Sequence, residues 1–269
     1  MDCNFYIIAT PIGNLSDITL RAIEILKEVD YIACEDTRIT RILLKKYSIK
    51  TKVFNYHKFN EKECSEKIFE LINTGKKIAL VSDAGTPCIS DPGREIIKLL
   101  NKKNIKISSI PGACAVTTFL TMIPRNNEEY AFIGFLPKNK NEQIEILNKY
   151  KYTNCIFYES PNRVIKSLTN IKESFGNIEI AIGRELTKIY EEIKTGKVEE
   201  IINYYTKNTL KGEIIIMIYQ KENHKTEDEE IKDKINILKE SGYTAKDISV
   251  IISKLYKENK NKIYNMALK

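Results

Sequence analysis

The sequence has 269 residues, of which 42% are hydrophobic, and its formal net charge is +7. This length allows two modest domains and a small appendage, and the composition is typical of a globular protein rather than a disordered or fibrous one. No apolar stretch reaches the roughly 20 residues of a membrane helix, and the N-terminal residues lack the basic start and apolar core of a signal peptide. We therefore expect a cytoplasmic protein with no membrane partner.

The cysteines and histidines do not have the pattern of a metal site. Six cysteines are scattered without a C-x-x-C pair, and His57 and His224 are the only histidines. A zinc site normally needs four closely spaced Cys and His ligands. We expect no metal and reduced, mostly packed thiols. The mild positive charge permits a polyanionic partner without demonstrating one.

Strand-like and helix-like segments alternate from residue 5 to residue 123. The expected strands are 5–11, 31–36, 52–58, 77–83 and 105–112, and the expected helices are 18–29, 38–47, 61–75, 94–104 and 113–123. Ser16 or Asp17 is the expected N-cap of the first helix, and Gly75 the expected C-cap of the third. This alternation predicts an α/β domain, residues 1–124, with a mostly parallel sheet covered by helices.

The pattern changes after the segment 124–129. The expected strands are then 130–137, 153–160, 177–187, 191–196 and 212–220, and the expected helices are 141–151, 161–174 and 197–207. They predict a second α/β domain, residues 125–221, with a mixed sheet.

A charged segment, 221–230, opens the last part of the chain, 222–269, and predicts a linker. The residues after it predict a small helical extension resembling a helix-turn-helix unit. Ile248, Ile251, Ile252 and Leu255 are expected on one apolar face, with lysines at its polar end. Those lysines are either a solvated face or a patch that contacts phosphates.

Loops rich in glycine, proline and acidic residues follow several expected strands. They are Thr10–Asn14, Glu35–Arg38, Asp83–Pro87, Pro111–Cys114, Glu159–Arg163 and Gly183–Lys188. Each alone could be a plain turn, and Arg38, Arg163 and Arg184 could form ordinary surface ion pairs. Ligands of parallel sheets, however, bind outside the carboxyl ends of the strands. The repetition of such loops therefore favours a binding site, with the first four at one edge of one sheet.

The loop residues limit the class of ligand. Neither a P-loop nor the G-x-G-x-x-G fingerprint is present, and few basic residues lie in the loops. This disfavours a ligand held mainly by its phosphates. Small residues at positions 84, 85, 112 and 113 allow close backbone approach, and Asp83 favours positive charge. S-adenosylmethionine, with a nucleoside, an amino-acid tail and a sulfonium, is compatible with these features.

Several segments occur in an order that resembles a known family. They are ATPIGNLSDITLRA, CEDTR, LVSDAGTPCISDPG, PGACAVTT, GFLP, FYESPNR, RELTK and KGE. They are similar to the ribosomal RNA small subunit methyltransferase I family, the 16S rRNA (cytidine-2'-O)-methyltransferases of the tetrapyrrole methylase superfamily. The resemblance covers about residues 5–220, and the tail is similar to the C-terminal helical extension of that family. Pro124-Arg125-Asn126-Asn127 departs from the expected lead into the second domain.

The resemblance implies two α/β domains of the tetrapyrrole-methylase type with the cofactor cleft between them, and a homodimer. It also implies methylation by S-adenosylmethionine of a cytidine 2'-hydroxyl in the decoding region of 16S rRNA, within the small ribosomal subunit. The implied cofactor-binding residues are Pro11, Ile12, Gly13, Asp83, Ala84, Gly85, Ile89, Ser90, Gly112, Ala113, Cys114 and Tyr158.

Acidic and basic residues near strand ends are candidates for the chemistry. A general base would assist the ribose hydroxyl, and the candidates are Glu159 and Glu35, ranked first, then Asp36 and Glu185. Candidates for rRNA phosphate contacts are Arg38, Arg163, Arg184 and Lys188.

Three other functions fit parts of the pattern. A methylase of the same superfamily could act on a tetrapyrrole or corrinoid precursor. A non-catalytic RNA-binding module could retain the fold without the cofactor. A phosphatase or sugar transferase could use Asp83 and Asp91, and would need a metal.

Overall fold

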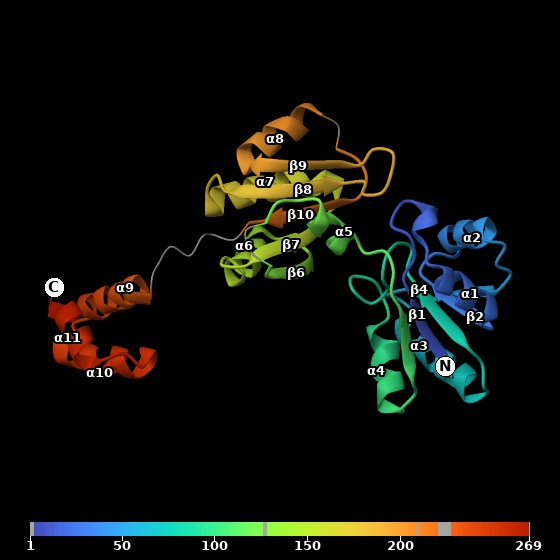
Figure 1. Ribbon diagram of the computed structural model, residues 1–269, viewed down its shortest axis with the longest axis horizontal. Coiled ribbons are helices and arrows are strands. Elements are labelled where there is room, and N and C mark those ends of the chain that lie inside the picture. Colours follow the sequence, from blue (N-terminus) through green and yellow to red (C-terminus); the bar gives the residue numbers. More distant parts are fainter. Residues whose placement is uncertain (1–2, 126–127, 209, 220–226, 269) are drawn as a thin grey trace. The chain divides into compact units, whose positions relative to one another are not determined.

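The computed structural model describes residues 3–125, 128–208, 210–219 and 227–268. Residues 1–220 form one compact unit and residues 221–269 a second. The first unit contains two five-stranded sheets (Figure 1). The expected boundary at residue 124 lies within this unit and stays a prediction. No helix among the described residues is long and apolar enough to cross a membrane.

The first sheet is entirely parallel, in the order β3-β2-β4-β1-β5. Its strands are β1 (Phe5–Ile8), β2 (Tyr31–Cys34), β3 (Lys52–Asn55), β4 (Ile78–Val81) and β5 (Ile107–Ile110), and its helices are α1 (Leu20–Glu28), α2 (Thr37–Lys46), α3 (Glu61–Asn73) and α4 (Arg94–Lys102). Successive strand residues face opposite sides, so Ile8 packs with α1 and α2 whereas Ile7 packs with α3 and α4. The predicted parallel sheet and its cover by the first four helices are confirmed, whereas the fifth expected helix, 113–123, packs on the second sheet.

The start of the first helix was predicted incorrectly. Leu15–Asp17 forms a separate 3-10 turn capped by Asn14, and the N-cap of α1 is Thr19, whose hydroxyl accepts from the amide of Ala22. The buried Ile18 precedes this cap and belongs to the core cluster against which Ile23 also packs. The C-cap of α3 is Thr74 rather than the predicted Gly75, which follows it with φ of +80°.

The second sheet is mixed, in the order β6-β7-β10-β8-β9, with β10 antiparallel to both neighbours. Its strands are β6 (Tyr130–Phe135), β7 (Asn154–Glu159), β8 (Glu179–Arg184), β9 (Glu192–Lys197) and β10 (Ile214–Ile218). Helices α6 (Lys140–Lys149), α7 (Pro161–Phe175) and α8 (Val198–Lys207) cover one face. Helix α5 (Ala115–Thr121), which follows β5, packs on the other face. There the fully buried Phe119 lies with Ile156, Ala181 and Ile215, so α5 ties the loops of the first sheet to the second.

The second unit is a three-helix bundle with its own core. Its helices are α9 (Glu227–Glu240), α10 (Ala245–Tyr256) and α11 (Lys260–Leu268). Residues 221–226 of the predicted linker lie outside the described residues. The prediction of a linker was wrong for residues 227–230, which begin α9. Ile248 and Ile252 are buried as expected, but Leu255 is 70% exposed.

Candidate functional site

The loops after β1, β2, β4 and β5 meet at one edge of the first sheet. Thr10 and Gly85 exchange two backbone hydrogen bonds of 2.8 and 3.0 Å. The amide of Asp36 donates to the Asp83 carboxylate at 3.0 Å, and the Thr86 hydroxyl donates to the carbonyl of Ala113 at 3.2 Å. The predicted convergence of these loops is confirmed, and it follows from the parallel sheet.

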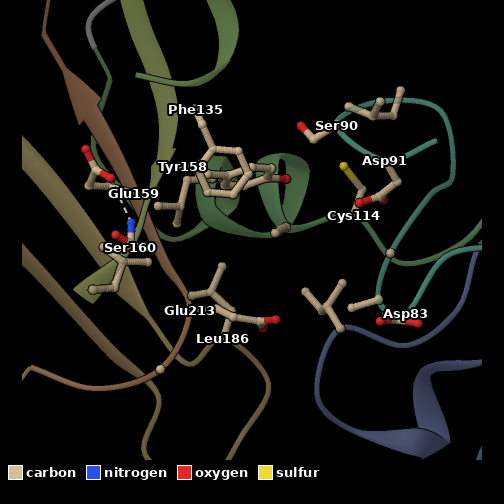
Figure 2. Close-up of a pocket in the computed structure, with 18 of the residues that line it drawn as sticks. Asp83, Ser90, Asp91, Cys114, Phe135, Tyr158, Glu159, Ser160, Leu186 and Glu213 are labelled. Atoms are coloured by element: carbon tan, nitrogen blue, oxygen red, sulfur yellow. Dashed lines mark hydrogen bonds between the residues drawn. The ribbon is translucent and has the colours of Figure 1, made fainter. Parts of the chain in front are cut away.

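A cavity of about 320 Å³ opens at this edge. Its lining combines loops of the first sheet with strand ends of the second. Figure 2 shows Asp83, Ser90 and Asp91 on one side and Tyr158 and Glu213 on the other. This volume is within the range of pockets that enclose a small organic ligand.

The structure brings most of the implied cofactor-binding residues to this cavity. Its lining includes Ile12, Asp83, Ala84, Gly85, Ile89, Ser90, Cys114 and Tyr158. Pro11, Gly13, Gly112 and Ala113 are not part of the lining. Two of these four, Gly13 and Gly112, instead lie where the chain packs too closely for a side chain. A Cβ on Gly13 would lie 2.5 Å from Cγ of Lys188, and one on Gly112 would lie 3.0 Å from Cβ of Ala9.

Other lining residues were not among the implied cofactor-binding ones, although Glu159 was expected as a candidate base. They are Thr86, Asp91, Ala115, Phe135, Glu159, Ser160, Pro161, Leu186, Gly212, Glu213, Ile214 and Ile215. Most come from the second sheet, so neither spacing nor strand position relates them to the first. The available signal was the occurrence of Phe135 in GFLP, Leu186 in RELTK and Glu213 in KGE, three segments that carry the family resemblance.

The cavity is acidic. Asp83, Asp91, Glu159 and Glu213 line it, and no Lys, Arg or His is among its described lining residues. Burial, reinforced by the charge of Asp36, raises the pKa of Asp83. Burial, with the charges of Asp83 and Glu213, also raises the pKa of Asp91. Such a site repels phosphate and stabilises a cation.

An aromatic cluster forms the wall on the side of the second sheet. The Tyr158 ring contacts Phe132 at 5.0 Å and Phe135 at 5.5 Å between centroids. Burial raises the pKa of Tyr158 above its usual range, so its hydroxyl stays protonated near neutral pH. Tyr158 can therefore pack against a planar ring and donate a hydrogen bond, but it is a poor general base.

The four candidate bases have different surroundings. The Glu159 carboxylate is fully buried, accepts from the Ser160 amide and the Ser167 hydroxyl at 2.8 and 2.6 Å, and lies 3.3 Å from Arg163. Hydrogen bonds from Arg38 lower the pKa of Asp36 to about 2. Although burial opposes the shift, Lys188 and the amide of Glu213 lower the pKa of Glu185.

Glu35 is the candidate base whose pKa is raised. The causes are burial and the charges of Asp83 and Asp91, partly offset by His57. Glu35 follows β2 at the same sheet edge as Asp83, although it does not line the cavity.

The candidate phosphate-binding residues also differ in availability. One Nη of Arg163 donates to the carbonyls of Leu136 and Pro137 at 2.7 and 2.8 Å. Arg184 pairs with Glu192 at 3.1 Å, and Lys188 pairs with Glu185 and Glu213. Arg38 is 86% exposed and pairs with Asp36. Of the four, it is the side chain that solvent reaches most freely.

Comparison with known proteins relates the chain to one enzyme family. The tetrapyrrole (corrin/porphyrin) methylase family model matches residues 4–202. The ribosomal RNA small subunit methyltransferase I of Rickettsia prowazekii is 46% identical over 216 residues, which are 79% of this chain and 77% of that protein. The protein of the same name from Buchnera aphidicola is 40% identical over 98% of this chain and 96% of its own length. The one from Thermotoga maritima is 41% identical over 80% of this chain and 98% of its own length.

Solved structures share the fold of the chain. Cobalt precorrin-4 methyltransferase, a cobalamin biosynthetic enzyme, superposes with a TM-score of 0.62 at 18% identity, over 80% of this chain and 94% of that one. Uroporphyrin-III-C-methyltransferase from Thermus thermophilus superposes with a TM-score of 0.57 at 14% identity, over 82% and 93%. The two-sheet architecture is therefore that of the tetrapyrrole methylases.

Proposed function

Because the chain belongs to the tetrapyrrole methylase family and, within it, to the ribosomal RNA small subunit methyltransferase I family, we propose that this methyltransferase uses S-adenosylmethionine to methylate 16S rRNA. The proposed acceptor is the 2'-hydroxyl of a cytidine ribose in the decoding region, within the small ribosomal subunit. The enzyme would act in the cytoplasm as a homodimer. The relatives are named for the small-subunit RNA, and the acidic cavity supports the choice of cofactor.

The cavity fits S-adenosylmethionine in charge and volume. When bound, the cofactor supplies a methyl group activated by a positively charged sulfur. Asp83 and Asp91 favour that charge, and the aromatic ring of Tyr158 offers a surface for adenine. Gly85 has φ of +77°, a conformation that favours glycine, and a Cβ there would lie 3.3 Å from Cγ2 of Ile12, so this part of the cavity wall is close-packed. The absence of cations from the described lining is the observation that carries this assignment.

Positioning and proton removal are the tasks left to the protein. Alignment of the acceptor hydroxyl with the methyl group can supply roughly 7–11 kcal/mol of the barrier reduction. Among the candidate bases we favour Glu35, because it follows β2 beside Asp36, whose amide binds Asp83 of the cavity, and because a raised pKa brings a carboxylate nearer to the working pH. Glu159 is better suited to hold Ser160, Ser167 and Arg163 in place, since its carboxylate oxygens already have partners.

Replacement of the proposed base separates catalysis from binding. Glu35→Gln is expected to lower kcat by about 10²–10⁴-fold, because a positioned base contributes roughly that factor. The dissociation constant of S-adenosylmethionine is expected to stay within about twofold, because Glu35 does not line the cavity. Single-turnover methyl transfer and equilibrium binding measure the two quantities. An unchanged kcat would remove Glu35 from the mechanism.

Labelled methyl transfer tests the proposed function. Methyl-tritiated S-adenosylmethionine is incubated with the protein and small ribosomal subunits from a strain lacking the enzyme, and the rRNA is digested to nucleosides. Label in 2'-O-methylated cytidine is the expected result. Label in another nucleoside would reject the cytidine ribose as acceptor. Label in an added tetrapyrrole but not in rRNA would favour a small-molecule methylase.

A further inference from the structure

A second hollow lies on the first sheet and is lined by cations. It is an open groove of about 760 Å³ along the edge strand β3, between α2 and α3. Five basic side chains line it: Arg41, Lys45, Lys50, Lys52 and Lys67. We call this hollow, with its five basic side chains, the basic groove. No acidic residue is among its described lining, in contrast to the cofactor cavity.

The cations of the basic groove remain available to a ligand. All five are exposed, and none of them has a carboxylate within ion-pair distance among the described residues. An adjoining hollow shares Lys50 and Lys52 and adds Lys27 and Lys76. Its one acid, Asp30, already pairs with Lys76 at 2.9 Å. The positive surface is therefore longer than the groove itself.

Aromatic rings form part of the groove. Phe54 lies beneath the ammonium of Lys67, at 5.3 Å from the ring centroid, and contacts Tyr31 edge-on at 6.3 Å. Basic side chains that track a backbone, combined with aromatic rings, are the usual means of binding single-stranded nucleic acid.

The groove is connected to the reaction site through β2. Tyr31 lies in the groove, and Glu35 follows the other end of the same strand. Four residues of strand span about 13 Å, which is about four steps of a stacked nucleic-acid strand at ~3.4 Å each. A bound strand can therefore extend from the groove toward the acceptor position.

We propose that the basic groove holds the phosphate backbone of a single-stranded tract of the substrate RNA, a few nucleotides from the methylated ribose. This rests on the proposed rRNA substrate. Lysines also protect edge strands from pairing with other sheets. A glutamate at the same position preserves that protection but repels phosphate, so charge reversal separates the two roles.

The test compares two variants of equal charge change. The test variant, Lys50→Glu/Lys52→Glu, reverses two charges of the basic groove. The control variant, Lys102→Glu/Lys166→Glu, reverses two exposed lysines on α4 and α7. These two lysines line neither the basic groove nor the cofactor cavity. The KM for small ribosomal subunits is expected to rise roughly tenfold in the groove variant only. The kcat and the affinity for S-adenosylmethionine are expected to match those of the control. Thermal unfolding checks that both variants are folded.

Direct RNA binding keeps this test independent of the proposed acceptor. A fluorescent 30-nucleotide single-stranded RNA is titrated at several salt concentrations. The magnitude of the negative slope of log affinity against log salt is expected to fall by about 1.4 in the groove variant, or ~0.7 per lost phosphate contact. A slope and KM equal to those of the control would overturn the proposal. Loss of subunit binding with unchanged RNA binding would also overturn it, in favour of an acidic protein partner. If wild-type protein methylates no rRNA yet the slope still falls, the proposed acceptor fails and the groove remains an RNA site.

Discussion

Asp91→Asn is expected to weaken S-adenosylmethionine binding by about 10- to 100-fold, because a hydrogen bond or contact to a charged group contributes roughly 1.5–3 kcal/mol. Asp91 is one of four acids that line the cavity, and no cation is among the described lining residues. Its replacement by an amide therefore removes one of the carboxylates that favour a positively charged ligand. The product, S-adenosylhomocysteine, has a neutral sulfur and is expected to lose less affinity. Isothermal titration calorimetry of both ligands measures the difference.

The same substitution is expected to stabilise the protein without ligand. The pKa of Asp91 is raised in the folded state, so its burial as a carboxylate costs stability as pH rises through that value, and an amide removes the cost. Asp17→Asn, an exposed position outside the cavity, is the matched control and is expected to change neither quantity. Unchanged affinity for S-adenosylmethionine in Asp91→Asn would show that the acidic cavity is not the cofactor site.

Phe119→Ala is expected to destabilise the first unit by about 3–5 kcal/mol, the usual cost of truncating a buried phenylalanine. Phe119 is fully buried in the cluster that joins α5 to the second sheet, and a Cβ on Gly183 would lie 2.7 Å from its ring. For a unit of this size the loss corresponds to about 6–20 °C in Tm. Cofactor affinity should fall as well, because both sheets line the cavity.

Phe59→Ala is a matched control for this prediction. Its side chain is 95% exposed, and the same substitution there is expected to change the free energy of unfolding by no more than about 0.5 kcal/mol. Scanning calorimetry compares the two variants. A loss below 1 kcal/mol in Phe119→Ala would contradict the role of α5 as the link between the sheets.

The sequence predicted the parts of the site that depend on strand order. Because β1, β2, β4 and β5 are parallel and short loops follow them, Ile12, Asp83 and Cys114 had to reach the same edge. The residues contributed by the second sheet, such as Glu213 and Leu186, could not be placed in this way. Their position depends on how α5 packs, which no local pattern encodes.

Side-chain partners were the least predictable feature. Glu159 ends β7 and Arg163 lies in the first turn of α7, yet they bind backbone carbonyls, Ser167 and each other. Their separation of four residues in the sequence does not distinguish an internal ion pair from a solvent-facing cation, because the pair joins a strand end to the following helix. The basic groove was also not predicted, because its cations come from α2, β3, α3 and the loop before β3 and meet only in the fold.

The central claim is that the acidic cavity binds the sulfonium cofactor, and the pH dependence of binding tests it most directly. Calorimetric titration of the wild-type protein with S-adenosylmethionine, from the ordinary aspartate pKa of 3.8 up to about pH 7, should show one site per chain. Affinity should rise with pH and then level off above the raised pKa values of Asp83 and Asp91, because a protonated carboxyl must lose its proton before it can stabilise the cation. No binding, or an affinity that does not change over this range, would contradict the account.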